Sequence, residues 1–194
     1  EKVFFDAAGN EAQVGIVRGL AWTSVGGDTL QIEVNVMPGK GVLQMTGQMG
    51  DVMKESAQIA LTYVRSVASD YGVKENYFEK HDIHLHIPEG AVPKDGPSAG
   101  ITMATAMLSA VTGRKVLPRV AMTGEVTLRG HVLMIGGLKE KLLAARMAQV
   151  EKVLVPAKNQ PDVEELSKEI TKGMEIVYIK EMNEVIREAF VPEK

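Results

Sequence analysis

The chain has 194 residues and a formal net charge of −3, and 45% of its residues are hydrophobic while 24% are charged. This length and balance are typical of one globular domain with a sizeable core and exclude a disordered chain. The sequence has no cysteine, which excludes disulfides, thiolate metal sites and a cysteine nucleophile. It also has no block of like charges and no apolar run of about 18 residues, so nothing indicates a nucleic-acid or membrane partner.

The first part of the chain, residues 13–45, has the pattern of β-strands. Four alternating apolar residues fall on one face: Leu30, Ile32, Val34 and Val36. Glycine-rich segments predict turns at 26–28 and 38–41. The segment is therefore typical of a β-meander.

Helices and strands alternate after this meander. Apolar residues at helical spacing predict a helix over 51–70 that Gly72 ends, and a second helix over 98–112 that Gly113 ends. The remaining helices are predicted over 139–149, 161–168 and 181–190, and the remaining strands over 81–87, 119–123, 127–134, 152–156 and 174–179. This order indicates an α+β fold, a β-meander followed by a mixed sheet packed with helices.

The sequence predicts a single domain over residues 1–194, because it contains no internal repeat and no low-complexity linker. It begins EKVFFDAAGN without an initiator methionine, so we expect it to be a fragment of a longer chain. We expect residues 1–12 and 191–194 to be flexible ends.

The segment PKDGPSAGITM, residues 93–103, places Ser98 among small residues ahead of an apolar helix. A serine there is usually the helix N-cap, because its oxygen accepts from the N–H groups of the first turn. Two features favour a nucleophile instead. Asp95 is available as a cap ahead of Pro97, and the helix N-terminus with its small neighbours can bind an oxyanion.

A serine nucleophile needs a base, and the sequence disfavours histidine. GPSAG matches the G-x-S-x-G elbow of α/β-hydrolases, but no buried strand precedes it and His131 is the only later histidine. A lysine can act if burial lowers its pKa from about 10.4 to roughly 7–8. In GGLKEKLLAARMA, Lys141 lies near the apolar stripe and Lys139 on the polar side, although helix lysines are usually solvated.

Two long segments resemble one protein family. DGPSAGITM, residues 95–103, resembles the active-site signature of the Lon family of ATP-dependent serine proteases. AMTGEVTLRGHVLMIGGLKEKLLAA, residues 121–145, resembles the segment with that family's catalytic lysine. The resemblance extends from about Val14 to Phe190 and implies the Lon proteolytic domain fold of the bacterial, ATPase-linked type.

The resemblance implies a Ser–Lys dyad in which Ser98 is the nucleophile and Lys141 the general base. It implies that Thr123 hydrogen-bonds the lysine and that Asp95 is an acid next to the site. A carboxylate in contact with the lysine would raise the lysine pKa and disfavour the neutral base. Trp22 corresponds to an aromatic residue near the substrate cleft, with a position in the core as the alternative.

The resemblance also implies a serine endopeptidase that cleaves unfolded or damaged proteins in cytoplasmic protein quality control. These substrates would be fed by an ATPase domain not present in this chain, and full-length family members are homo-hexamers. ATP and magnesium would belong to that ATPase domain, because no G-x-x-x-x-G-K-[ST] motif occurs in this sequence. We therefore expect no cofactor in this domain.

We expect no metal site either, because His84 and His86 share a strand face without a third ligand at suitable spacing. One different class of function stays open beside the peptidase. It is a non-catalytic interaction module in which Ser98 caps a helix and Lys141 is solvated.

Overall fold

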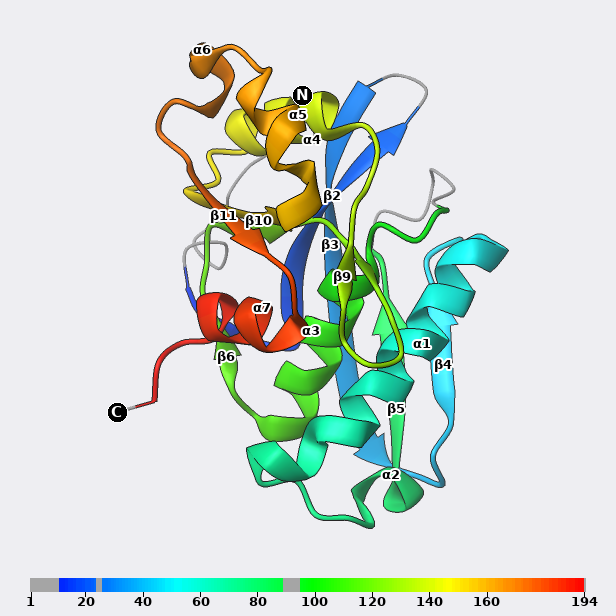
Figure 1. Ribbon diagram of the computed structural model, residues 1–194. Helices are drawn as coiled ribbons and strands as arrows, with labels where there is room; N and C mark the ends of the chain where they lie inside the picture. The colour runs from blue at the N-terminus through cyan, green and yellow to red at the C-terminus, as the bar shows by residue number, and fades with distance from the viewer. Residues whose placement is uncertain (1–10, 24–25, 89–94, 194) are drawn as a thin grey trace.

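A seven-stranded mixed sheet runs through the computed structural model, which describes residues 11–23, 26–88 and 95–193 (Figure 1). In spatial order its strands are β11 (Glu175–Ile179), β10 (Lys152–Pro156), β7 (Val120–Met122), β2 (Ile16–Thr23), β3 (Gly26–Pro38), β5 (His81–His86) and β4 (Leu43–Thr46). Two short ladders accompany it, β1 (Gln13–Val14) with β6 (Lys115–Val116) and β8 (Glu125–Val126) with β9 (Val132–Leu133). The sheet and its helices confirm the predicted α+β class.

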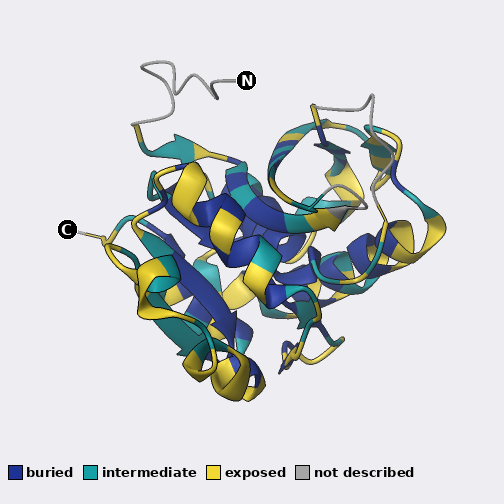
Figure 2. Ribbon diagram, turned by 90° about the horizontal axis from the view of Figure 1, so that it is seen from above, coloured by how far each residue is buried: buried dark blue, intermediate teal, exposed yellow. Residues whose placement is uncertain are grey.

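Helices cover both faces of this sheet. The first face carries α1 (Asp51–Val67), α3 (Gly100–Thr112) and α7 (Met182–Ala189), and the second carries α4 (Leu138–Met147), α5 (Gln160–Glu164) and α6 (Lys168–Thr171). Strand β10 alternates between the two cores, with Leu154 in the first and both Val153 and Val155 in the second. Burial is therefore concentrated in the sheet and the helix faces turned toward it, as Figure 2 shows.

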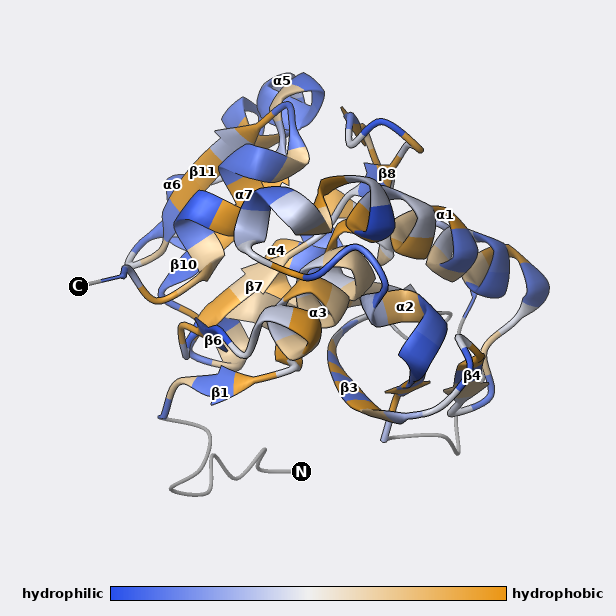
Figure 3. Cartoon of the chain, turned by 90° about the horizontal axis from the view of Figure 1, so that it is seen from below, coloured by the Kyte–Doolittle hydropathy of each residue, from blue (hydrophilic) through white to orange (hydrophobic). Residues whose placement is uncertain are grey.

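Helix α3 is buried at every position from Gly100 to Ser109. Figure 3 shows it next to β7, coloured mostly white to orange, which marks intermediate to hydrophobic residues. Its small residues let neighbouring elements pack around it. Helix α1 instead buries one stripe, which includes Met53, Ala57 and Val64. It passes through the 3₁₀ turn η2 (Ala68–Tyr71) and stops at Gly72, whose left-handed backbone favours glycine. A short helix α2 (Tyr77–Lys80) then leads into β5.

The predicted strands differ from the structure in three places. In the β2–β3 hairpin Thr23 pairs with Gly26, so residues 26–28 are strand and the turn predicted there is wrong. The meander is interrupted because β5 lies between β3 and β4, pairing antiparallel with β3 and parallel with β4. The single strand predicted over 127–134 is wrong, because Thr127 N–H donates to the carbonyl of His131 and closes the β8–β9 hairpin.

The ends of the chain lie only partly within the described residues. Residues 1–10 and 194, most of the predicted flexible ends, lie outside them. Val191 N–H donates to the carbonyl of Lys115 at 2.9 Å. The single domain over residues 1–194 stays a prediction. No helix in the described ranges combines the length and the apolar character that a membrane crossing requires.

Helix α4 approaches the β2–β3 hairpin very closely at Gly27. A Cβ atom at this position would lie 2.0 Å from the carbonyl oxygen of Glu140 and 3.2 Å from the backbone nitrogen of Lys141. Only a residue without a side chain fits beneath this turn of α4. Gly27 therefore sets how deeply Lys141 enters the protein.

We expect Gly27→Ala to lower the free energy of unfolding by about 1–3 kcal/mol, because backbone atoms cannot move aside as a flexible side chain can. Denaturant unfolding measures this change. Gly136→Ala is the control for stability, because a Cβ atom there meets nothing within 4 Å. Equal unfolding midpoints for the two variants would contradict the close approach.

Candidate active site

A cleft opens at the carboxyl end of β7, where β7 and β2 separate. Strand β2 pairs with β7 at Arg18 and Gly19, whereas Leu20 to Thr23 continue beside β3. The cleft has a volume of about 400 Å³. Four of the five predicted site residues line it: Trp22, Asp95, Ser98 and Lys141.

Ser98 lies in the turn that precedes α3. The N-cap of this helix is Ala99, and no side chain caps it. The helix-cap interpretation of Ser98 is therefore wrong for α3. The serine is held through its backbone instead: its carbonyl accepts from Gly124 N–H at 2.8 Å, while Ile101 N–H donates to Gly124 O at 3.1 Å. These two bonds fix Ser98 against the chain that leaves β7.

Lys141 enters the cleft from the first turn of α4 and is 3% exposed. Its Nζ donates to Thr123 Oγ1 at 3.3 Å, and Thr123 is fully buried directly after β7. Burial lowers the pKa of Lys141 from 10.5 to about 8, because the charged ammonium loses its hydration. Lys139, by contrast, is exposed. The solvated alternative is thus wrong for Lys141 and correct for its neighbour.

Ser98 and Lys141 line the same cleft, but their side chains are not hydrogen-bonded to each other. Within the described part of the chain, Lys141 Nζ is bonded to Thr123 and not to Ser98 Oγ. Catalytic hydrogen bonds are often long in ligand-free enzymes and shorten when substrate binds. Ser98 and Lys141 therefore share one cleft in this ligand-free structure without a direct hydrogen bond.

The carboxylate of Asp95 points toward the N-terminus of α1. Its Oδ1 accepts from Met53 N–H at 2.9 Å, and the N–H groups of Met53, Gly96 and Val52 hold its pKa below the ordinary value. The N-cap of α1 is Gly50, where a Cβ atom would lie 2.3 Å from the Asp95 carboxyl carbon. Asp95 is therefore a cap supplied to α1 from a distant loop, and its interpretation as a cap for α3 is wrong.

Trp22 is 61% exposed, so the alternative of a core residue is wrong. Its ring lies against Gly137, where a Cβ atom would be 3.1 Å from the ring carbon Cγ. Gly137 is the N-cap of α4 in a left-handed conformation, with φ of 66°. The exposed aromatic ring thus forms the rim of the cleft above the turn that leads to Lys141.

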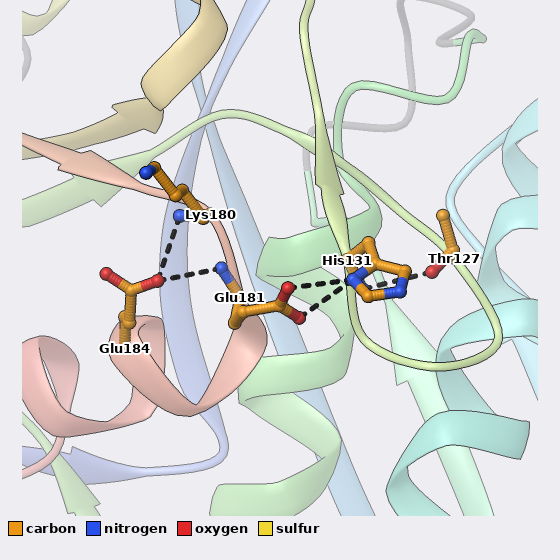
Figure 4. Close-up of polar contacts among 5 residues, drawn as sticks. All are labelled: Thr127, His131, Lys180, Glu181 and Glu184. Carbon is orange, nitrogen blue, oxygen red and sulfur yellow. Dashed lines mark hydrogen bonds and ion pairs between the residues drawn. The ribbon is translucent and has the colours of Figure 1, made fainter.

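Residues 134–137 line the cleft together with β2, and the two contacts that anchor them were not recognised from the sequence. The first lies in the hairpin before them. His131 Nδ1 contacts Glu181 Oε1 at 2.8 Å, and His131 N–H donates to Thr127 Oγ1 at 3.0 Å (Figure 4). Glu181 also forms a capping box with Glu184 at the start of α7. This contact ties the hairpin to α7.

The second anchor is Asn159, which is fully buried in the 3₁₀ turn η3 (Ala157–Asn159) after β10. Its Oδ1 accepts from Ile135 N–H at 2.9 Å, and its Nδ2 donates to Ile135 O at 2.9 Å. The second Nδ2 proton is directed at Asp162 Oδ2, 2.8 Å away. The only sequence signal is an Asn-x-x-Asp spacing after a buried strand, which is common in turns.

His84 and His86 lie on β5, two strands away from β2, and neither lines the cleft. His84 Nε2 is 2.9 Å and His86 Nδ1 2.6 Å from the hydroxyl oxygen of Thr46. Among the described residues, no three or more His, Cys, Asp or Glu side chains are grouped to hold a metal ion.

Comparison with known proteins identifies the family of the chain. The Lon protease (S16) C-terminal proteolytic domain family matches residues 1–192. The chain belongs to this family. It is 66% identical to the Lon protease of Lachnoclostridium phytofermentans over 96% of the chain, and 54% identical to Lon protease 1 of Bacillus subtilis over 98% of the chain.

These alignments cover 23% and 24% of the two relatives, so the chain spans about a quarter of their length. The family membership confirms the predicted Lon proteolytic domain fold, and the family is one of serine peptidases. Residue roles do not follow from family membership alone. They rest on the geometry of this cleft.

We expect Asp95→Ala to lower the melting temperature, because α1 loses its cap, whereas Asp95→Asn should keep most of it. The folded-state pKa of Asp95 is lowered from 3.8, so its stabilisation is complete above that pH and is lost as the pH falls below it. Thermal melting of the chain and of Asp95→Ala at pH 7 and at acid pH measures this. If the difference in melting temperature between the unaltered chain and Asp95→Ala is the same at pH 7 and at acid pH, the capping role is contradicted.

Proposed function

We propose that this domain is a serine endopeptidase in which Ser98 is the nucleophile and Lys141 the general base. The observation that carries the proposal is the buried amine of Lys141, which has a pKa of about 8 and lies in the same cleft as Ser98. A lysine with this pKa is partly neutral near physiological pH, so it can accept a proton. Thr123 supports the role because its hydroxyl orients the amine without adding negative charge.

In the proposed reaction, Ser98 Oγ attacks the carbonyl carbon of the scissile peptide while its proton passes to Lys141 Nζ. The resulting ammonium then gives this proton to the leaving amine as the carbon–nitrogen bond breaks. Water attacks the remaining serine ester, with Lys141 again taking a proton and returning it to Ser98. The protein ends each cycle with both groups in their starting state.

The backbone around Ser98 narrows the choice of oxyanion donors. Gly100 N–H donates to Pro97 O, and Ile101 N–H donates to Gly124 O, so these two first-turn groups are occupied. The N–H groups of Ser98 and Ala99 have no acceptor among the described residues. We assign the oxyanion to these two groups, since free backbone donors at a helix start stabilise negative charge.

The substrate backbone has a place beside β2. Residues Leu20 to Trp22 pair with β3 on one side, and on the other side they have left β7 and line the cleft. An extended peptide can add to such an edge through main-chain hydrogen bonds. This addition would carry successive substrate residues past Ser98 and under the ring of Trp22.

For the longer protein we propose the work of a Lon protease. It would degrade unfolded or damaged proteins in cytoplasmic quality control, as a homo-hexamer whose ATPase domain feeds substrate to this domain. ATP and magnesium would serve that ATPase domain, and this domain would need no cofactor. The curated relatives named Lon protease are about four times longer than the matched region, which leaves room for such a domain.

The alternative function, a non-catalytic interaction module, is disfavoured by two contacts. Ser98 does not cap α3, and Lys141 is buried against Thr123 instead of solvated. Neither arrangement has an evident purpose in a binding module. Burial of a lysine amine without a carboxylate partner destabilises a fold, so a catalytic use explains its presence better.

We expect Ser98→Ala to reduce hydrolysis of an unstructured peptide at least about 10³-fold, because the nucleophile is removed. The melting curve should stay unchanged, since the Ser98 side chain caps no helix. Ser69→Ala, at an exposed serine outside the cleft lining, is the matched control. Retained hydrolysis by Ser98→Ala would eliminate the proposed nucleophile.

We expect Lys141→Met to abolish hydrolysis and to stabilise the chain at pH 7, because a buried ammonium is replaced by an apolar side chain. Since the folded-state pKa is about 8 and the ordinary value 10.5, the unfolded chain binds more protons between these pH values. The contribution of Lys141 to stability therefore rises by about 3 kcal/mol from pH 8 to 10.5.

The gain in stability from Lys141→Met should accordingly shrink as the pH rises through this window. Denaturant unfolding at pH 7 and at pH 10 measures it, and Lys139→Met, at an exposed lysine two residues away, serves as the control. If Lys141→Met keeps its peptidase rate, or if its stability gain does not depend on pH, Lys141 is not the base described.

A further inference from the structure

The strongest unexplained polar feature outside the Ser98–Lys141 pair is the side chain of Asn159. It is fully buried and meets both backbone groups of one residue, Ile135, at 2.9 Å each. Asp162 takes the remaining amide proton and thereby fixes which end of the carboxamide donates. The carboxamide oxygen and both amide protons of Asn159 therefore all have hydrogen-bond partners.

The pairing of Asn159 with Ile135 imitates a neighbouring strand. In an extended chain, the N–H and C=O of one residue point to one side, and those of the next residue point to the other. Because both groups of Ile135 point toward Asn159, we infer that the groups of its neighbours, Met134 and Gly136, are turned away from it, with the chain bending at Gly136. Met134 and Gly136 both line the cleft, and their backbone groups have no partner within the described residues.

We propose that Asn159 is a positioning residue of the substrate cleft, which holds Ile135 so that the backbone groups of Met134 and Gly136 pair with an extended substrate. The inference rests on the proposed peptidase function and deepens it. The substrate peptide then lies between two edges, β2 on one side and residues 134–136 on the other. A substrate strand between two edges forms backbone hydrogen bonds at consecutive residues, whereas one edge alone would bond to every second residue.

A positioning role for Asn159 affects peptide binding alone, whereas a purely structural role would affect peptide binding and Ser98 reactivity together. The hydrogen bonds of the Asn159 side chain go to Ile135 and Asp162 and not to Ser98 or Lys141, so its loss should leave the reactivity of Ser98 in place. The loss should weaken the binding of extended peptides, which need the cleft wall. A general loosening of the fold would instead reduce both properties together.

The experiment compares Asn159→Ser with Gln160→Ser in the full chain. Gln160 is the exposed neighbour, and its side chain bonds to Glu164 on the surface. Two rates are measured for each variant: modification of Ser98 by phenylmethylsulfonyl fluoride, a small reagent that needs no extended cleft, and hydrolysis of an unstructured peptide. Melting curves accompany both.

We expect Asn159→Ser to raise KM for the peptide at least about tenfold, because the cleft wall loses two hydrogen bonds. Modification of Ser98 should stay within about twofold, and Gln160→Ser should match the unaltered chain in both rates. The inference is overturned if KM is unchanged in Asn159→Ser, or if modification and hydrolysis slow in parallel. Failure of the reagent to modify Ser98 in the unaltered chain would overturn the proposed function itself.

A second measurement needs no variant and applies even if Asn159→Ser does not fold. Single amide N–H groups of the peptide substrate are replaced in turn by ester oxygens, and KM is measured with the unaltered chain. Pairing on both edges predicts that replacements at consecutive positions raise KM. A rise at every second position alone would show pairing with β2 only and would overturn the inference.

Discussion

The burial of one amine, Lys141 Nζ, is the constraint on which the rest of the cleft depends. A lysine in water stays charged near neutral pH, so the protein must remove its hydration without offering a carboxylate in exchange. Three features achieve this here. Gly27 lets α4 pack closely against the β2–β3 hairpin, and Gly137 begins that helix in a left-handed conformation. Thr123 accepts a hydrogen bond from the amine through an uncharged hydroxyl oxygen. Each lies on a different element of the sheet or its cover.

The acid beside the site is kept away from this amine by another helix. Asp95 is two residues from Pro97 and three from Ser98, yet its carboxylate is bonded to the first turn of α1. A carboxylate in contact with Lys141 would raise the lysine pKa and keep the amine protonated. The capping of α1 by Asp95 thus serves two purposes. It gives a hydrogen-bond acceptor to a helix whose own N-cap is Gly50, and it leaves burial as the cause of the lowered Lys141 pKa.

Local patterns in the sequence predicted the parts of this cleft that depend on local chemistry. The helical spacing placed Lys141 near the apolar stripe and Lys139 on the polar side, and the structure buries one and exposes the other. Contacts between distant segments could not be predicted this way. Asp95 reaches Met53 across 42 residues, and Asn159 reaches Ile135 across 24. Residues 127–134 were predicted as one strand, but residues 127–131 form the turn of the β8–β9 hairpin, in which Gly130 has a left-handed backbone.

The pKa of the Lys141 amine is the quantity to determine, by following the side-chain ¹³Cε resonance of this residue through a pH titration by NMR. Lys141→Met identifies the resonance by its disappearance. A midpoint near 8 is expected, because burial lowers the pKa to that value from 10.5. A midpoint near 10.5 would mean that the amine is solvated and charged at neutral pH, and would contradict the proposal that Lys141 is the general base.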